Sequence, residues 1–541
     1  MIKYFTIAGL LVFMATPPGC AQAPNTVSIH IDAAKNRRPI HPEIYGVSWG
    51  SPQALAGLRC PVNRAGGNAM TQYNWKLNSD NRGNDWYFES IADSDPTPGG
   101  RGDTFVHDSK SNGAQPMMTI PMIGWVGTLG PKRSRLVSFS VKKYGPQQKT
   151  DPYYSDGGNG NKPDGTPIIN DQADANVKAD ASFQKGWVRH LVAKWGQSKK
   201  GGVRYYLLDN EPSIWSSTHR DVHPRGETLD EIVNDSISYS LMIKSVDPGA
   251  MTCGPEEWGF PGYFWSGADQ DYGNKNHWPS SRPDKTSHNN EDYVPWLLDQ
   301  MRIASKKAGI RLFDVLTLHY YPQGGEDGDD NSDAAQLKRN RSTRCLWDPS
   351  YVDESWINDK VCLIPRMRAW VAAHYPGTKI GITEYNWGAE KSMNGATTQA
   401  DILGIFGREG LDVGCRWVCP DISTPTFQAM KIFRNYDGHG GSFGDVSVDD
   451  ATPNPDNVSS FAAIRKSDGA LTVIVINKQL HDAAAVDLDI KDFAAAGKAE
   501  AWQIADGKPI VKIDPAAIDG GALSTTVPAE SITLFVVPKH G

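Results

Sequence analysis

Residues 203–212 read VRYYLLDNEP. Apolar and aromatic side chains follow one another at Tyr205–Leu208 without polar alternation, which is typical of a strand buried on both faces. Such strands belong to parallel sheets that helices cover on both sides. The strand then breaks into the polar stretch Asp209–Pro212. This segment therefore predicts an α/β fold with polar groups at the carboxyl end of a buried strand.

The same pattern recurs on both sides of this strand. Short β-rich runs alternate with amphipathic segments such as Phe183–Trp195, whose apolar residues share one helix face. Another helical segment, Ala369–Tyr375, stops at a Pro-Gly pair just before the next run. These alternations predict a TIM-like (β/α)₈ barrel, with the Gly-, Asp- and Pro-rich stretches 91–114 and 145–175 as inserted loops. The predicted strands are Tyr45–Trp49, Leu58–Arg64, Pro116–Ile123, Val203–Glu211, Ala250–Glu256, Phe313–Tyr321, Lys379–Glu384 and Asp412–Val418.

After about residue 440 the chain carries strands without helices between them. Asp468-Gly469 is a tight-turn signal between two of these strands. The early run Val27–Ile31 alternates in the same way, and we expect it to join them. We therefore predict a barrel from residues 41–430 and a smaller antiparallel β-sandwich from residues 25–40 plus 431–541. The late strands are Phe461–Arg465, Leu471–Asn477, Val486–Ile490, Glu500–Ile504 and Ile532–Val537.

The composition narrows the class of protein. A formal net charge of −7 and the absence of any Lys- and Arg-rich run argue against nucleic acid as a partner. The 17 Trp residues supply flat faces on which sugar rings can pack. No later segment holds about 18 unbroken apolar residues, so no transmembrane helix is expected. Among the cysteines, Cys345 and Cys362 are the best candidates for a disulfide, with buried free thiols as the alternative.

The first residues have the pattern of an export signal. The apolar stretch Ile7–Ala15 follows a positive start and is too short to span a membrane. Small residues near position 20 suit cleavage, so we predict that residues 1–23 are a signal peptide and that the protein is secreted, extracellular or periplasmic. Lipid anchoring at Cys20, which follows Gly19, is the alternative.

Two of the predicted strands end in a glutamate. Strand four delivers Glu211 and strand seven delivers Glu384, and functional groups of a barrel collect at the carboxyl ends of its strands. A lone rim glutamate is usually a surface salt-bridge partner, but two of them on separate strands indicate a working pair. Retaining glycoside hydrolysis needs such a pair, because one carboxylic acid protonates the leaving oxygen while a carboxylate about 5–5.5 Å away attacks the anomeric carbon.

The neighbours of the two glutamates suggest their roles. Glu211 fits the acid/base, and the preceding Asn210 would hydrogen-bond the sugar 2-OH. Glu384 fits the nucleophile, with Tyr385 or a neighbouring Tyr holding its orientation. Arg64, at the end of strand two, would keep Glu384 ionised, or alternatively would only brace the barrel rim.

Six longer stretches of the sequence are distinctive: 64–75 (RAGGNAMTQYNW), 85–89 (DWYFE), 208–224 (LDNEPSIWSSTHRDVHP), 319–322 (HYYP), 341–347 (RSTRCLW) and 382–387 (ITEYNW). On these stretches the chain resembles glycoside hydrolase family 44 from about residue 27 to 537. The resemblance implies a barrel plus β-sandwich, a retaining mechanism and β-1,4-glucan substrates including xyloglucan, with Glu211 as acid/base and Glu384 as nucleophile. Asn68 joins the candidate substrate-binding residues. Ala65 stands where the family commonly has Trp, which bears on fine specificity.

Aromatic residues at strand ends and in rim loops are candidate platforms for sugar rings. Plain loop packing is the alternative, above all for Trp347. His319 ends strand six and is a candidate contact of the catalytic region, with a structural histidine as the alternative. The aromatic candidates are Trp86, Tyr321, Trp347, Trp387 and Trp417.

The sequence predicts no cofactor for catalysis. The segment 156–165 carries oxygen ligands and glycines, and we take Asp156 and Asp164 as candidate ligands of a structural Ca²⁺. Together these features predict a secreted retaining endo-β-1,4-glucanase, monomeric, with a β-glucan polysaccharide as its partner. A mannan-directed or exo-acting retaining glycosidase and a non-catalytic glycan-binding protein are the alternatives.

Overall fold

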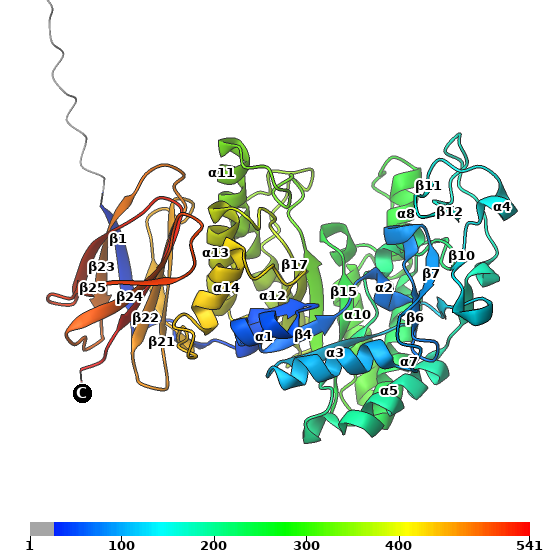
Figure 1. Ribbon diagram of the computed structural model, residues 1–541, viewed down its shortest axis with the longest axis horizontal. Helices are drawn as coiled ribbons and strands as arrows, with labels where there is room; N and C mark the ends of the chain where they lie inside the picture. The colour runs from blue at the N-terminus through cyan, green and yellow to red at the C-terminus, as the bar shows by residue number, and fades with distance from the viewer. Residues whose placement is uncertain (1–25, 541) are drawn as a thin grey trace, which may run out of the picture.

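The computed structural model describes residues 26–540. The predicted signal peptide at 1–23 and the predicted anchor at Cys20 lie outside these residues. Figure 1 shows an elongated molecule with a β-sandwich at one end, the barrel beside it, and an early-loop region at the far end. In the described part of the chain, no helix is both long and apolar enough to cross a membrane.

The predicted (β/α)₈ barrel is confirmed. Eight parallel strands close in the order β14-β15-β16-β17-β18-β3-β4-β8. Inward side chains such as Val62, Tyr205, Val315 and Val413 fill the interior as a packed core. The second strand begins later than predicted because Leu58 still belongs to a helix. The strands are β3 (Gly46–Ser48), β4 (Val62–Ala65), β8 (Gln115–Ile120), β14 (Tyr205–Leu208), β15 (Met251–Glu257), β16 (Val315–Tyr320), β17 (Lys379–Tyr385) and β18 (Val413–Arg416).

Helices surround the barrel, and α5 shows why they form where they do. The Asp180 side chain accepts a 2.9 Å hydrogen bond from Phe183 N and caps the helix, whose buried face carries Trp187, Val188 and Leu191. The other long helices follow the strands in the same alternation. Their bounds are α1 (Pro52–Leu58), α3 (Gly100–Ser111), α5 (Ala181–Trp195), α7 (Leu229–Val246), α10 (Tyr293–Ala308), α12 (Leu363–His374), α13 (Met393–Glu409) and α14 (Pro425–Arg434).

The prediction of plain loops at 91–114 and 145–175 was wrong. Helix α3 occupies half of the first stretch, and its polar, Gly-rich sequence hid a buried face of Phe105, Val106 and Ser109. A two-stranded hairpin occupies part of the second stretch, and further short strands flank both. These strands are β5 (Tyr73–Asn74), β6 (Ser79–Asn81), β7 (Glu89–Ala92), β9 (Trp125–Gly127), β10 (Leu136–Val137), β11 (Thr150–Asp151), β12 (Tyr154–Gly158) and β13 (Asn176–Lys178). The remaining helices are α2 (Asn68–Thr71), α4 (Val141–Tyr144), α6 (Trp215–Thr218), α8 (Gly267–Lys275), α9 (Pro283–Ser287) and α11 (Asp333–Ser342).

The late strands form two facing sheets. One has the order β2-β19-β21-β22-β27-β24-β25 and the other β20-β1-β23-β26. β1 pairs along its length with β23, so the N-terminal strand joins the sandwich as expected, and Figure 1 shows it in blue among orange and red strands. The strands β2, β19, β20, β25 and β26 were not predicted. The bounds are β1 (Val27–Asp32), β2 (Arg38–Pro39), β19 (Val446–Ser447), β20 (Asp449–Ala451), β21 (Val458–Ile464), β22 (Leu471–Asn477), β23 (Ala484–Lys491), β24 (Lys498–Ile504), β25 (Val511–Ala517), β26 (Ala522–Val527) and β27 (Ser531–Val537).

A buried ion pair joins the sandwich to the barrel. Lys478 Nζ, just after β22, lies 3.0 Å from Oδ2 of Asp401 in α13, and both side chains are almost fully buried. Thr343 Oγ1 donates to the same Asp401 oxygen over 2.7 Å. The barrel and the sandwich also pack closely at Gly404 of α13, where an added Cβ would lie 2.1 Å from the Phe461 ring of β21. The two parts are therefore held against each other by specific contacts.

All six cysteines in residues 26–540 are free thiols, including Cys345 and Cys362. The Cys345 thiol faces a carboxylate oxygen of Asp353 at 3.2 Å, whereas the Cys362 thiol faces the carbonyl of Trp347 at 3.5 Å. The alternative of unpaired thiols is therefore the one that the structure bears out.

Candidate active site

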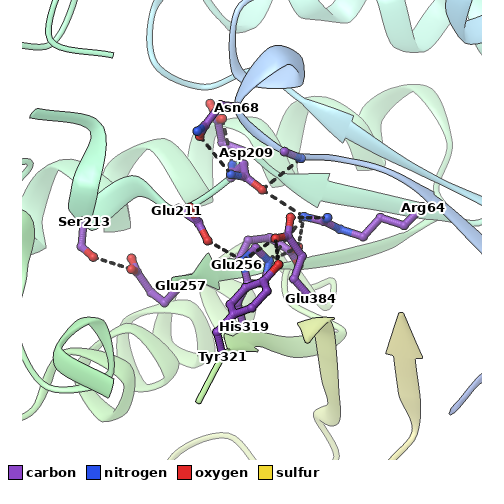
Figure 2. Close-up of polar contacts among 12 residues, drawn as sticks. Arg64, Asn68, Asp209, Glu211, Ser213, Glu256, Glu257, His319, Tyr321 and Glu384 are labelled. Carbon is purple, nitrogen blue, oxygen red and sulfur yellow. Dashed lines mark hydrogen bonds and ion pairs between the residues drawn. The ribbon is translucent and has the colours of Figure 1, made fainter. Parts of the chain in front are cut away.

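Glu211 and Glu384 meet at the carboxyl end of the barrel (Figure 2). Glu211 follows β14 in a left-handed conformation with φ 47°, and Pro212 then starts a short helical turn. Glu384 lies in β17. One carboxyl oxygen of each glutamate and one ring nitrogen of His319 lie within 4.8 Å of one another. Glu211 and Glu384, 173 positions apart in sequence, therefore share one site, as their places at strand ends predicted.

Arg64 joins several acceptors from the end of β4. Its fully buried guanidinium donates from Nη1 to Glu384 Oε1 at 2.6 Å, and from Nη2 to Glu256 Oε2 at 2.9 Å and to Asn210 Oδ1 at 3.1 Å. Burial alone would lower the pKa of Arg64, but the two carboxylates raise it. Arg64 therefore stays charged and contacts Glu384, as the sequence predicted, rather than only bracing the rim.

His319 stands between carboxyl groups. Its Nδ1 lies 2.9 Å from Glu211 Oε1, and its Nε2 lies 3.2 Å from Glu256 Oε2. Burial by itself lowers the pKa of His319, but Glu384, Glu211 and Glu256 together raise it to about 9. An imidazole that faces acceptors on both sides and keeps its charge donates from both nitrogens.

The two glutamates have different surroundings. Burial raises the pKa of Glu211, the nearby Glu384 raises it further, and His319 opposes both. Glu384 accepts hydrogen bonds from Arg64 and, over 2.8 Å, from the hydroxyl of Tyr321. Burial raises the pKa of Tyr321, so this residue remains a hydroxyl donor. Glu211 is thus placed to hold a proton, and Glu384 is held by donors.

Tyr321, and not Tyr385, orients Glu384. Tyr385 is fully buried, and its hydroxyl accepts a 3.0 Å hydrogen bond from Gln399 Nε2 on the side of α13. Successive side chains of a strand point to opposite faces, so the residue directly after Glu384 turns away from it. Of the two options that the sequence left open, the neighbouring tyrosine is the one that the structure supports.

Glu256 is a member of the site to which sequence reasoning assigned no role. It lies near the end of β15, is fully buried, and accepts hydrogen bonds from Arg64 and His319. Burial by itself raises the pKa of Glu256, but Arg64 and His319 lower it to about 2. The signal was available, because the predicted strand 250–256 ends in this glutamate, just as strands four and seven end in theirs.

Asn210 and Asn68 extend the network toward the early loops. Asn210 Oδ1 accepts hydrogen bonds from Arg64 and, over 3.2 Å, from Gly67 N, while its Nδ2 faces Asn68 Oδ1 at 3.4 Å. Asn68 Nδ2 donates to Asp85 Oδ1 over 3.0 Å. Both predicted residues therefore belong to the site region, and Asp85 adds a carboxylate that the sequence argument did not select.

Two of the predicted aromatic platforms are partly exposed beside this network. Trp417 follows β18, and its ring centroid lies 6.0 Å from Cζ of Arg64. A Cβ at Gly67 would lie 2.4 Å from that ring, so this glycine makes room for it. Trp86 follows Asp85, and its Nε1 donates to Asp151 Oδ2 over 3.3 Å. Trp417 borders the catalytic centre, and Trp86 lies where the Asn68–Asp85 contact ends.

The prediction of a sugar platform is wrong for Trp387, and for Trp347 the structure supports the alternative of plain packing. Trp387 is only 3% exposed, and its Nε1 donates to Ser342 Oγ over 2.8 Å. The ring of Trp347 packs under Arg408, 4.4 Å from Cζ to centroid, beside Asp401 at the contact with the sandwich. The position after β17 did not reveal that the Trp387 ring turns back into the layers around the barrel, and Trp347, which follows a short helical turn, does the same.

Trp356 is an exposed aromatic residue that sequence reasoning missed. Its side chain is 57% exposed, and its Nε1 donates to Gln323 Oε1 over 3.3 Å. Gln323 Nε2 in turn donates to the carbonyl of Tyr321 over 2.9 Å. Trp356 lies in an irregular segment, where no periodicity indicates which side chains face solvent.

The residues predicted for Ca²⁺ make local contacts instead. Asp156 accepts hydrogen bonds from Ser140 Oγ at 2.9 Å and Lys142 N at 2.8 Å, and Asp164 accepts one from Thr166 N at 2.9 Å. Neither belongs to a group of His, Cys, Asp or Glu side chains that could share a metal within residues 26–540. The calcium site stays a prediction.

The group Glu211, His319 and Glu384 has the ligand types and spacing of a metal site. However, the Arg64 guanidinium and the charged His319 ring already donate to these carboxyl groups. Two fixed positive charges at this distance disfavour a further cation. The donor set therefore fits proton transfer between carboxyl groups better than metal binding.

Comparisons with known proteins agree on one family. The model described as glycoside hydrolase family 44 matches residues 79–324. Endoglucanase A of Paenibacillus lautus is 34% identical over 508 residues, which cover 89% of this chain and 68% of that protein. Beta-mannanase/endoglucanase A of Caldicellulosiruptor saccharolyticus is 31% identical over 90% of this chain, and the chain spans 37% of that protein's length.

Solved structures give the same result. CelM2, described as a bifunctional glucanase-xylanase from a metagenome library, is 54% identical, with a TM-score of 0.95 over 96% of this chain and 100% of that one. A Paenibacillus polymyxa xyloglucanase of family 44, solved with xyloglucan, is 29% identical, with a TM-score of 0.78 over 95% and 100%. A family 51 arabinofuranosidase from Xanthomonas axonopodis pv. citri, 13% identical with a TM-score of 0.59 over 95% and 99%, shares the fold alone.

Proposed function

Because the chain belongs to glycoside hydrolase family 44, we propose that it cleaves internal β-1,4-glucosidic bonds of β-glucans, including xyloglucan, with retention of configuration. The observation that carries this proposal is the pair Glu211 and Glu384, whose nearest oxygens lie within 4.8 Å. Retaining glycosidases hold their carboxyl groups about 5–5.5 Å apart, whereas inverting ones leave roughly 6.5–9.5 Å for a water molecule. The short separation supports double displacement.

In the first step, an oxygen of Glu384 attacks the anomeric carbon as the bond to the leaving oxygen breaks. Glu211 gives its proton to that leaving oxygen, so the departing sugar leaves as a neutral alcohol. Arg64 and Tyr321 position Glu384 for the attack through their hydrogen bonds. A covalent glycosyl–Glu384 ester and an ionised Glu211 result.

In the second step, Glu211 removes a proton from an incoming water, whose oxygen attacks the anomeric carbon and releases Glu384. The raised pKa of Glu211 supports both uses, since the group can be protonated before the first step and basic afterwards. Asn210 lies between Arg64 and Asn68, next to the acid/base, which supports its assignment to the sugar 2-OH.

Polymeric glucan suits the surroundings of the pair. Trp417 borders the centre and Trp86 lies in the early-loop region, so aromatic faces are available along one side of the site. Export through a signal peptide at residues 1–23 belongs to the same proposal, because a polysaccharide substrate lies outside the cell. The proposal also includes a monomeric state, a structural Ca²⁺ near Asp156 and Asp164, and a lipid anchor at Cys20 as the alternative to soluble release.

The test is an activity screen on xyloglucan, carboxymethyl-cellulose, glucomannan and xylan, with the fall in viscosity compared with the release of reducing ends. We expect rapid viscosity loss on xyloglucan or carboxymethyl-cellulose and a β-configured first product by NMR. An α-configured first product contradicts retention, and slow viscosity loss with steady sugar release indicates an exo-acting enzyme. If the protein binds glucan but cleaves none of these polymers, the proposed catalytic function is wrong.

A second substrate class has specific support. CelM2 is described as a glucanase-xylanase, and the Caldicellulosiruptor relative as a β-mannanase/endoglucanase. We therefore include xylan and mannan as secondary substrates in the proposal. Their kcat/KM values relative to that of xyloglucan, measured on the same preparation, decide whether the main activity is glucan-directed.

A further inference from the structure

The carboxyl end of β15 carries two consecutive glutamates that turn in opposite directions. The register of β15 against β16 shifts between Pro255 and Glu257, and Glu256 adopts a left-handed φ of 60°. Figure 2 shows Glu256 turned toward Arg64 and His319, and Glu257 turned toward Ser213. A left-handed residue other than glycine is strained, and strain of this kind is often kept where a functional side chain must be aimed.

Glu256 is linked to Glu211 directly through the backbone and indirectly through the His319 ring. Its backbone carbonyl accepts a 3.0 Å hydrogen bond from Glu211 N, which fixes the backbone of the residue after β14. Its carboxylate lies 3.2 Å from His319 Nε2, and Nδ1 of the same ring lies 2.9 Å from Glu211 Oε1. Backbone and side chain of Glu211 are therefore both tied to Glu256.

The charges around the site balance only when Glu256 is counted. Arg64 and His319 bring two positive charges, and with Glu211 protonated the negative charges are those of Glu256 and Glu384. Glu256 is fully buried and surrounded by these donors, so it has no access to a substrate. It can act on the reaction only through its neighbours.

The protonation state of His319 decides where the Glu211 proton goes. A doubly protonated His319 donates from Nδ1 to Glu211 Oε1, which leaves the other oxygen of Glu211 to carry its proton toward the leaving group. A neutral ring with its proton on Nε2 would instead accept at Nδ1, and would draw the Glu211 proton into an internal hydrogen bond. A fixed negative charge on the Nε2 side favours the first arrangement.

We propose that Glu256 is a positioning residue for Glu211: its buried carboxylate keeps His319 as a double donor and so leaves the Glu211 proton free for the leaving oxygen. This inference rests on the proposed function, in which Glu211 is the acid/base. Glu256 should therefore matter most for substrates with poor leaving groups, because their leaving oxygen must be protonated as the bond breaks.

The test is Glu256→Gln, which preserves the side-chain size. Both donors reach the same oxygen, Oε2, so the amide oxygen of the substituted glutamine can replace it. The charge is lost, and the amide NH2 takes the buried place of Oε1, which has no hydrogen-bond partner. We expect kcat/KM for xyloglucan and for phenyl cello-oligosaccharides to fall about 100-fold, as for a partial loss of general acid catalysis. Dinitrophenyl cello-oligosaccharides, whose leaving group departs without a proton, should lose less than about 5-fold.

The pH profile gives a second measurement. Removing one buried negative charge makes every remaining group around it easier to deprotonate, so the pKa values of His319 and Glu211 both fall. The high-pH limb of kcat/KM, where Glu211 loses its proton, should therefore move to lower pH in Glu256→Gln. A variant damaged only in its packing would keep the wild-type limb.

Asp103→Asn is the matched control. Asp103 is a buried carboxylate of α3, bonded to Lys194 Nζ at 2.8 Å and Trp195 Nε1 at 3.0 Å on the outside of the barrel. Its replacement should lower the melting temperature but leave the leaving-group ratio and the pH limb unchanged. If Glu256→Gln does not fold, His319→Gln is tested instead. It removes the ring that links Glu256 to Glu211, so kcat/KM should again fall mainly for the poor leaving groups.

Equal losses on both classes of leaving group, or an unchanged pH limb, overturn the assignment of Glu256. Failure of the proposed function is distinguishable, because wild-type protein would then cleave none of the substrates. If the assignment is right, kcat/KM of the double variant Glu256→Gln/His319→Gln equals that of the more impaired single variant, because Glu256 acts on Glu211 through His319.

Discussion

Arg64 Nη1 lies 2.6 Å from Oε1 of Glu384, and both side chains are almost wholly withdrawn from solvent. The contact joins the end of β4 to β17, which lie apart in the barrel order. A buried cation that binds a carboxylate directly, together with the Tyr321 hydroxyl, fixes where the proposed nucleophile can move. The position of Glu384 therefore depends on Arg64 as much as on its own strand.

Replacing Arg64 should damage both activity and folding. Arg64→Met leaves Glu384 and Glu256 buried without their cation, and breaking a buried pair in this way typically costs about 3–5 kcal/mol of unfolding free energy. Arg64→Lys keeps the charge but loses the fork that serves several acceptors. We expect kcat/KM to fall roughly 1000-fold in Arg64→Met and less in Arg64→Lys. Equal activity of the two variants would show that the charge is irrelevant.

The acid/base should be visible in the pH dependence. The raised pKa of Glu211 means that its proton is kept above the usual range of a glutamate and lost as pH rises through the raised value. The activity should therefore fall on the high-pH side, and this limb should vanish from kcat/KM for dinitrophenyl substrates in Glu211→Gln. Azide should rescue that variant by attacking the covalent intermediate, whereas Glu384→Gln should stay inactive on every substrate.

Tyr321→Phe isolates the hydroxyl that contacts Glu384. Loss of this 2.8 Å hydrogen bond should lower kcat roughly 10- to 100-fold, with little change in KM, because the contact positions the nucleophile. The control is the adjacent Tyr320→Phe, whose hydroxyl donates to Asp353 at 3.2 Å. That variant should lose about 1 kcal/mol of stability and keep its kcat. A similar loss of kcat in both variants would contradict the role of Tyr321.

The barrel and the catalytic pair could be predicted because both depend on local pattern. Apolar runs such as Tyr205–Leu208 indicate buried strands, and a polar residue directly after such a run lies at the carboxyl end of the barrel. The same rule applied to β15 would have selected Glu256. Glu211 and Glu384 stand in distinctive motifs, whereas Glu256, a buried glutamate that contacts other side chains, has no motif of its own.

What could not be predicted depends on contacts distant in sequence. Trp387 and Trp417 stand at the ends of adjacent strands, yet one donates to Ser342 in the surrounding layer and the other lies by Arg64. Helix α3 was missed because its sequence is mostly polar, and only the barrel wall shows which few side chains it buries. Orientation and burial come from tertiary packing, which overrides local propensity.

The two tryptophans should therefore respond differently to truncation. Trp417→Ala removes a partly exposed ring beside the catalytic centre, and we expect kcat/KM on xyloglucan to fall roughly 10-fold or more, with the melting temperature nearly unchanged. Trp387→Ala leaves a core cavity and should cost about 3–5 kcal/mol of unfolding free energy. A stability loss in Trp417→Ala as large as that in Trp387→Ala would mean that Trp417 is a packing residue.

The ion pair between Asp401 and Lys478 should couple the sandwich to the barrel thermodynamically. Asp401→Asn leaves the Lys478 ammonium buried with no opposite charge, which typically costs about 3–5 kcal/mol. Because that cost falls on the contact between the two parts, we expect calorimetry to resolve two transitions where the wild type unfolds in one.

The exposed pair of His481 and Asp333, 3.1 Å apart, is the control, and His481→Ala should melt like the wild type. Activity measured well below the first transition should be unchanged in both variants, since neither residue touches the site. If Asp401→Asn melts in a single unshifted transition, the contact between the two parts rests on apolar packing such as that of Phe461 against α13, and the ion pair adds little to it.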